Sequence, residues 1–75
     1  MTITIFRQGG IWLGTYEGRH GGGPRNMPLG DDAENAAAWA INQVIRVGWS
    51  NPSGWRIVAP DAVLSLIPSD FRGSP

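Results

Sequence analysis

The chain opens with two short segments of bulky apolar residues, the first alternating threonine with isoleucine and the second set around a glycine. Residues 2–6 read TITIF and residues 11–16 read IWLGTY, and both are rich in the β-branched and aromatic residues typical of strands. The intervening RQGG supplies two glycines, which can adopt the positive φ angles that a tight turn needs. The pattern therefore predicts an antiparallel hairpin at the start of the chain.

The register of this hairpin decides which side chains share a face. A three-residue turn at 8–10 would set Ile5 opposite Leu13, whereas a two-residue turn at 9–10 would set Phe6 opposite Leu13. We favour the three-residue turn because it sorts the aliphatic side chains together on one face. The other face would then carry three aromatic residues, Phe6, Trp12 and Tyr16.

Residues 31–47 show the spacing of an amphipathic helix. Asp31 stands at its start as a cap, Glu34 follows three residues later as in a capping box, and Gly48 follows the end. One stripe of the helix is the expected core face and consists of Ala33, Ala37, Ala40, Ile41, Val44 and Gly48. The opposite side carries four polar residues, Asn35, Asn42, Gln43 and Arg46. Trp39 lies among them, and a tryptophan on a polar face requires a reason.

Two further segments after the helix have the composition of strands. Residues 55–59, WRIVA, and residues 62–67, AVLSLI, are joined by a turn at Pro60 and Asp61. The second segment has an alternative as a helical turn that begins at Asp61.

Two stretches of the chain lack periodicity. The fourteen residues 17–30 are expected to form a long, flexible, glycine-rich loop, because a stretch of this length without periodicity is typical of functional or disordered loops. The tail, residues 68–75, contains proline, serine and glycine and is expected to fray, except where Phe71 holds part of it in place.

Together these elements predict a single α+β domain that spans residues 1–75. Their order is β-β-α-β-β, which gives a four-stranded antiparallel or mixed sheet with one helix packed on one face. One helix covers one side of a sheet, so we expect the other face to be open unless the tail, the loop or a partner covers it.

Composition narrows the class of protein. The chain has no cysteine, which excludes disulfides and cysteine-based zinc sites and favours a reducing, cytoplasmic compartment. No stretch approaches the ~20 apolar residues of a membrane span, so no membrane partner is expected. Six basic and six acidic residues give a net charge of zero, which argues against a general attraction to nucleic acid.

The stretch GRHGGGPRNM at 18–27 invites comparison with phosphate-binding loops. It lacks the lysine and the serine or threonine of such loops, and the helix after it begins with acidic residues that would repel a phosphate. His20 has no other metal-ligand residues at suitable spacing, and the serines lack the context of a catalytic nucleophile. We therefore expect no enzyme activity, no metal and no cofactor.

Tryptophan and arginine remain as the residues of interest. Four tryptophans are difficult to enclose in so small a core, and Trp and Arg are enriched among the residues that dominate protein interfaces. We therefore expect a partner-binding surface drawn from the long loop, the polar helix face and the open sheet face. Its expected residues are Trp12, Arg19, His20, Arg25, Trp39, Arg46 and Arg56.

In its length, its lack of a catalytic motif and the order of TITIF, IWLGTY, DDAENAAAWAINQVIRV, WRIVA and AVLSLI, the chain resembles the anti-CRISPR inhibitors of phages and mobile elements. The resemblance implies binding to a subunit of a CRISPR surveillance complex in a bacterial host cell, with its DNA recognition or nuclease recruitment blocked. These inhibitors share no motif, so no site residue follows from the resemblance. The neutral charge favours occlusion of a protein surface over mimicry of DNA.

Two alternative functions depend on the aromatic face expected on the sheet. An open sheet face bearing Phe6, Trp12 and Tyr16 would stack unpaired bases, which gives a single-stranded nucleic-acid-binding module. Burial of that face between two copies would give a structural, homodimeric phage accessory protein. The sequence is compatible with a monomer and with a homodimer.

Overall fold

Strands β1 (Thr2–Gln8) and β2 (Ile11–Glu17) form the antiparallel hairpin that the sequence predicts. The structure is a computed structural model and describes residues 1–18 and 23–73. Both turn residues, Gly9 and Gly10, have positive φ angles of 62° and 82°, as a two-residue type I′ turn requires. This turn sets Phe6 opposite Leu13, so the expected three-residue turn is wrong.

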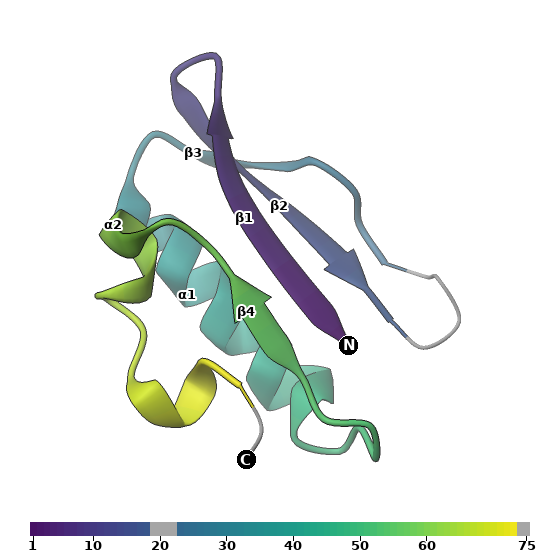
Figure 1. The fold of residues 1–75 in the computed structure, drawn as a ribbon. Helices are drawn as coiled ribbons and strands as arrows, with labels where there is room; N and C mark the ends of the chain where they lie inside the picture. The colour runs from purple at the N-terminus through teal and green to yellow at the C-terminus, as the bar shows by residue number, and fades with distance from the viewer. Residues whose placement is uncertain (19–22, 74–75) are drawn as a thin grey trace.

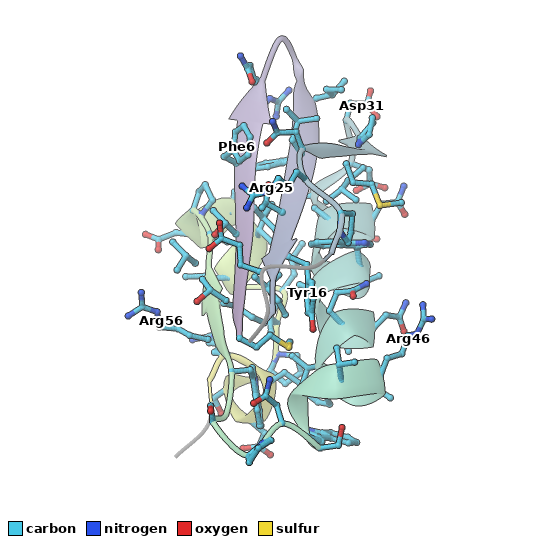
Figure 2. All side chains as sticks on the ribbon, turned by 90° about the vertical axis from the view of Figure 1, so that its right-hand side faces the viewer. Phe6, Tyr16, Arg25, Asp31, Arg46 and Arg56 are labelled. Atoms are coloured by element: carbon cyan, nitrogen blue, oxygen red, sulfur yellow. The ribbon has the colours of Figure 1, made fainter. Side chains whose placement is uncertain are left out.

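The observed register separates the aromatic residues of the hairpin. Trp12 and Tyr16 lie on the same face as the buried Ile3 and Ile5, whereas Phe6 lies on the opposite face. Figure 2 shows Tyr16 directed toward helix α1 and Phe6 on the side away from it. The expected aromatic face is therefore wrong, because a shift of one residue in register moves a whole strand's side chains to the other face.

Two short strands complete a mixed sheet in the order β3-β2-β1-β4 (Figure 1). Strand β4 (Arg56–Val58) runs parallel to β1 and is shorter than the strand predicted at 55–59. Strand β3 (Met27–Gly30) pairs antiparallel to β2 within the stretch predicted as a flexible loop. The sequence hides β3 because proline and glycine are rare inside strands.

Helix α1 (Ala33–Gln43) packs on one face of the sheet and continues into the π-helical segment Val44–Gly48 (Figure 1). Its cap is Asp32 rather than Asp31, because the Asp32 carboxylate accepts a hydrogen bond of 2.9 Å from the backbone N–H of Glu34. The predicted capping box is therefore wrong by one residue.

The core lies between α1 and the sheet. Alanines dominate the buried stripe of the helix, so the helix axis can approach the sheet closely. The buried residues on the helical side are Ala36, Ala37, Ala40 and Val44, and those on the sheet are Ile3, Ile5, Trp12 and Ile57. Ala36 was not in the predicted stripe, and the predicted Ala33 and Ile41 are half-buried at its margins.

The segment after β4 is helical, as in the alternative for residues 62–67. Helix α2 (Asp61–Leu64) carries Val63, which is followed four residues later by Ile67, and both side chains are buried against the core. This spacing is that of a helix rather than a strand. The α+β class, the four-stranded mixed sheet and one main helix on one face are confirmed, but β3 takes the place of the last predicted strand.

The C-terminal segment docks against β4 as far as residue 73. The indole N–H of Trp55 donates a hydrogen bond of 2.9 Å to the carbonyl of Phe71, and the N–H of Ile57 donates one of 2.9 Å to the carbonyl of Arg72. The Phe71 ring also lies 5.4 Å from the ring of Trp49, centroid to centroid. The predicted fraying is therefore wrong for residues 68–73, and residues 74–75 lie outside the described residues.

The face of the sheet away from α1 is lined by half-buried side chains, among them Thr4, Phe6 and Leu13. Figure 2 shows Phe6 and Arg56 projecting on this side. Within the ranges 1–18 and 23–73, no helix has the length and apolar character needed to cross a membrane.

Candidate binding cleft between helix α1 and the sheet

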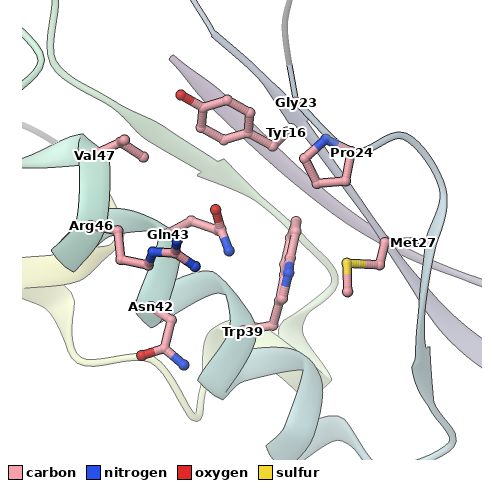
Figure 3. Close-up of a pocket in the computed structure, with 9 residues that line it drawn as sticks. All are labelled: Tyr16, Gly23, Pro24, Met27, Trp39, Asn42, Gln43, Arg46 and Val47. Carbon is pink, nitrogen blue, oxygen red and sulfur yellow. The ribbon is translucent and has the colours of Figure 1, made fainter.

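A cleft of about 490 Å³ opens between helix α1 and the β2–β3 side of the sheet. Its sheet-side wall consists of Tyr16, Gly23, Pro24 and Met27, and its helical wall consists of Trp39, Asn42, Gln43, Arg46 and Val47. Figure 3 shows the Trp39 ring between the two walls. The cleft is therefore bordered by segments that are far apart in the sequence.

The helical wall follows from the spacing of residues along α1. Trp39, Gln43 and Arg46 succeed one another at intervals of four and three residues, which places them on one side of a helix. This side is adjacent to the alanine stripe that packs on the sheet. The sequence predicts the same grouping, because it places Asn42, Gln43 and Arg46 around Trp39.

Trp39 lies in the cleft because Gly14 of β2 leaves room for its ring. A Cβ atom at Gly14 would stand only 2.6 Å from Cζ3 of Trp39, closer than real Cβ atoms come to their neighbours. The indole is half-buried and packs against the core cluster. Contact with the backbone of β2 is thus the reason for a tryptophan on a side that otherwise carries polar residues.

The glycine-rich stretch at 18–27 packs against Tyr16 through its described glycines, Gly18 and Gly23. Gly23 has a φ of +121°, and a Cβ atom there would overlap the Tyr16 ring and lie 2.7 Å from the Tyr16 carbonyl oxygen. The backbone N–H of Tyr16 also donates a hydrogen bond of 2.9 Å to the carbonyl of Pro24. A Cβ atom at Gly18 would lie 3.1 Å from the Tyr16 hydroxyl. These glycines therefore let the backbone pack on Tyr16 at the rim of the cleft.

A π-helical turn forms one end of the cleft. The backbone N–H of Trp49 donates a hydrogen bond of 3.0 Å to the carbonyl of Val44, five residues earlier. A π-helical turn contains more residues than an α-helical turn, so it changes which side chains follow the face of the helix. Arg46 and Val47 lie in this segment, and both border the cleft. Such turns occur frequently at functional sites.

Among the described residues that line the cleft, Arg46 carries the formal charge. No carboxylate is among its lining residues in the described ranges, and Arg46 makes no ion pair or hydrogen bond with another described residue. Other arginines are engaged: Arg25 lies 3.7 Å from a carboxylate oxygen of Glu17, and Arg72 donates a hydrogen bond of 2.9 Å to the Ile67 carbonyl. The guanidinium of Arg46 is therefore available to an anion.

The structure brings together two of the predicted partner-binding residues, Trp39 and Arg46. Trp12 is only 4% exposed and lies in the core, so its side chain does not offer a contact surface. Its indole N–H is buried and has no hydrogen-bond partner among the described residues. Packing of the ring, with Arg7 5.5 Å above its centroid, accounts for this tryptophan.

Two further predicted residues that the structure describes, Arg25 and Arg56, do not line the cleft. Arg25 is exposed and pairs with Glu17 at the base of the glycine-rich stretch, and Arg56 projects from β4 on the opposite side of the sheet (Figure 2). Arg19 and His20 lie outside the described residues.

Sequence reasoning missed the sheet-side wall of the cleft. Tyr16 was assigned to the opposite face by the wrong register, and Met27 was assigned to a loop. The only signal for this wall is the glycine-rich stretch itself, whose Gly23 is required by the ring of Tyr16.

The described side chains that line the cleft are aromatic, apolar and amide groups together with the guanidinium of Arg46. Among the described residues, the lining contains no histidine, cysteine, serine or carboxylate, and its hydroxyl group is that of Tyr16. In the same ranges, no group of three or more His, Cys, Asp or Glu is placed to hold a metal ion. Comparison with protein-family models, with curated proteins and with solved structures finds no match for the chain.

Proposed function

We propose that this chain is a non-enzymatic binding protein that takes an apolar anchor of a partner protein into the cleft. The observation that carries the proposal is the concavity of about 490 Å³ walled by Trp39, Tyr16 and Met27 and edged by Arg46. Aromatic residues, methionine and arginine are the types enriched at protein interfaces. A concave, mainly apolar site with a few polar groups is also the usual form of a binding pocket.

The identity of the partner in this proposal is inferred from the resemblance to anti-CRISPR inhibitors. The partner would be a subunit of a CRISPR surveillance complex, and the bound chain would inhibit the complex by occluding a protein surface. The resemblance now rests on chain length and on the lack of a catalytic motif, because the order of elements on which it also rested differs in the structure.

Binding to a purified surveillance complex tests the proposal. We expect immobilised wild-type protein to retain the complex and to reduce its binding of target DNA. Trp39→Ala should weaken retention by about tenfold or more, because truncation of a buried interface aromatic removes a large share of the binding energy. Circular dichroism must show that the variant keeps the wild-type fold.

A matched control is available at Trp49, which is 58% exposed and lies outside the cleft. Trp49→Ala should retain the complex as the wild type does. Arg46→Ala, a change at an exposed position in the cleft, should weaken retention without affecting the fold. Failure of the wild type to bind would reject the surveillance complex as partner, and equal retention by all variants would reject the cleft as the site.

A further inference from the structure

We infer that the cleft recognises an extended peptide segment in which an aromatic side chain and an acidic side chain stand two positions apart. The inference rests on the proposed function, because it names the chemistry of the anchor that the partner would present. It is carried by the order of groups along the helical wall, where Trp39, Gln43 and Arg46 follow one another.

The aromatic half of the motif follows from the aromatic side chains that line the cleft. The rings of Tyr16 and Trp39 and the thioether of Met27 all line the cleft (Figure 3). Aromatic rings pack favourably against other rings in tilted or offset arrangements, and a methionine sulfur makes favourable contacts with ring edges. A third aromatic ring is therefore the side chain that suits this space best.

The acidic half follows from charge. Arg46 is the formal charge in the described lining, and it has no carboxylate partner among the described residues. The amide side chains of Asn42 and Gln43 lie on the same wall and can both donate and accept hydrogen bonds. An entering segment thus meets a cation and two amides, which favours a carboxylate and discriminates against a basic residue.

The spacing follows from helix geometry. Arg46 follows Trp39 by seven positions, which corresponds to about 10 Å along the helix axis at 1.5 Å per residue. In an extended peptide, residues two apart face the same side and are separated by about 7 Å. The long Arg46 side chain can span the remainder, and the amides of Asn42 and Gln43 lie between, where they can pair with the peptide backbone.

Titration with short peptides tests the inference. The probes are acetyl-Gly-Phe-Gly-Glu-Gly-amide and the reversed order acetyl-Gly-Glu-Gly-Phe-Gly-amide, each with a counterpart in which glutamine replaces glutamate. The readout is the NMR signal of the Trp39 indole N–H, assigned with a Trp39→Phe variant. We expect at least one glutamate peptide to bind about three- to tenfold more tightly than its glutamine counterpart, because the carboxylate meets a partly solvated guanidinium.

Pairs of variants, one inside the cleft and one outside it, show which side chains cause the preference for the glutamate peptide. Arg46→Gln should abolish the preference for glutamate, whereas Arg56→Gln, on the opposite side of the sheet, should preserve it. Asn42→Asp should weaken binding of the glutamate peptide by like-charge repulsion, whereas Asn35→Asp, on the same helix but outside the cleft, should have no such effect.

The outcomes separate this inference from the proposed function. Equal binding of the glutamate and glutamine peptides would overturn the acidic part, and yet the proposal of an apolar anchor would stand. Absence of binding by all four peptides would overturn the motif, while retention of the surveillance complex by the wild type but not by Trp39→Ala would still support the cleft as a docking site.

Discussion

Glycine at two positions allows the aromatic side chains of the cleft to lie where they do. The ring of Trp39 rests on the backbone at Gly14, and the backbone at Gly23 rests on the ring of Tyr16. In each case a Cβ atom would occupy space that the ring already fills. A glycine also adopts positive φ without a steric penalty, and this second property matters at Gly23 only.

Gly23→Ala should destabilise the fold by about 1–3 kcal/mol, because an added methyl group overlaps a packed ring and the backbone has positive φ. Gly10→Ala is the matched control, since its φ is also positive, at 82°, but no atom lies within 4 Å of the added Cβ. Urea unfolding should therefore show a larger loss for Gly23→Ala than for Gly10→Ala. Equal losses of stability in the two variants would mean that the Tyr16 ring moves away from the added methyl group at no cost, and that its packing on Gly23 does not stabilise the fold.

Gly14→Ala should cost about 1–3 kcal/mol of stability, because the methyl group displaces a ring from a packed position. It should also shift the NMR signal of the Trp39 indole N–H. Gly73→Ala serves as control, since its Cβ would meet its nearest neighbour, the Trp55 carbonyl oxygen, at an ordinary distance of 3.5 Å. A Gly14→Ala variant with wild-type stability and an unshifted Trp39 signal would contradict the packing described for the cleft.

At the scale of elements, two neighbouring carboxylates at the start of helix α1 differ in their roles. The Asp32 carboxylate accepts the hydrogen bond from the Glu34 N–H, whereas Asp31 precedes the cap and makes no hydrogen bond with the described residues. Asp32→Ala should reduce the free energy of unfolding by about 1 kcal/mol, as expected for the loss of an N-cap. Asp31→Ala should cost less, since it removes only a charge near the helix dipole. A greater loss for Asp31→Ala in urea unfolding would restore the cap position predicted from the sequence.

Elements with strong local signals were predictable from the sequence. The helix over 31–47 agrees with the combined span of α1 and its π-helical end, because a cap, frequent alanine and a regular apolar stripe all indicate the same element. The hairpin was also predictable, since two glycines lie between two β-rich segments. Its register was not, because sorting side chains by type favoured a turn that the paired glycines did not adopt.

Elements that depend on distant partners were not predictable in the same way. Strand β3 contains a proline and a glycine, and it is a strand because β2 offers it an edge. Strand β4 pairs in parallel with β1, whose residues lie 54 positions earlier in the chain, and no local pattern indicates this pairing. Residues 62–67 have the apolar composition of a strand, but the burial of both Val63 and Ile67, four residues apart, is that of a helical turn.

At the scale of the whole molecule, the cleft exists because helix α1 covers only part of one face of the sheet. The helix lies on the sheet through its alanine stripe, and the residues beside that stripe face the β2–β3 side without filling the space between. The sequence grouped Trp39 with Arg46 correctly, because both lie on one side of a single helix. It could not place Tyr16 and Met27 opposite them, because that requires the hairpin register and the edge strand β3.

The C-terminal segment belongs to the same core as the hairpin. We therefore expect the two to unfold together in one cooperative transition. Ile67 is 1% exposed and Ile5 is 2% exposed, although one follows α2 and the other lies in β1. Ile67→Val and Ile5→Val should each cost about 0.5–1.5 kcal/mol, because each removes one buried methylene group. Tryptophan fluorescence and circular dichroism should give coincident unfolding curves for both variants, as for a two-state domain. A wild-type midpoint for Ile67→Val, or an earlier fluorescence transition, would show instead that the C-terminal segment unfolds independently of the sheet.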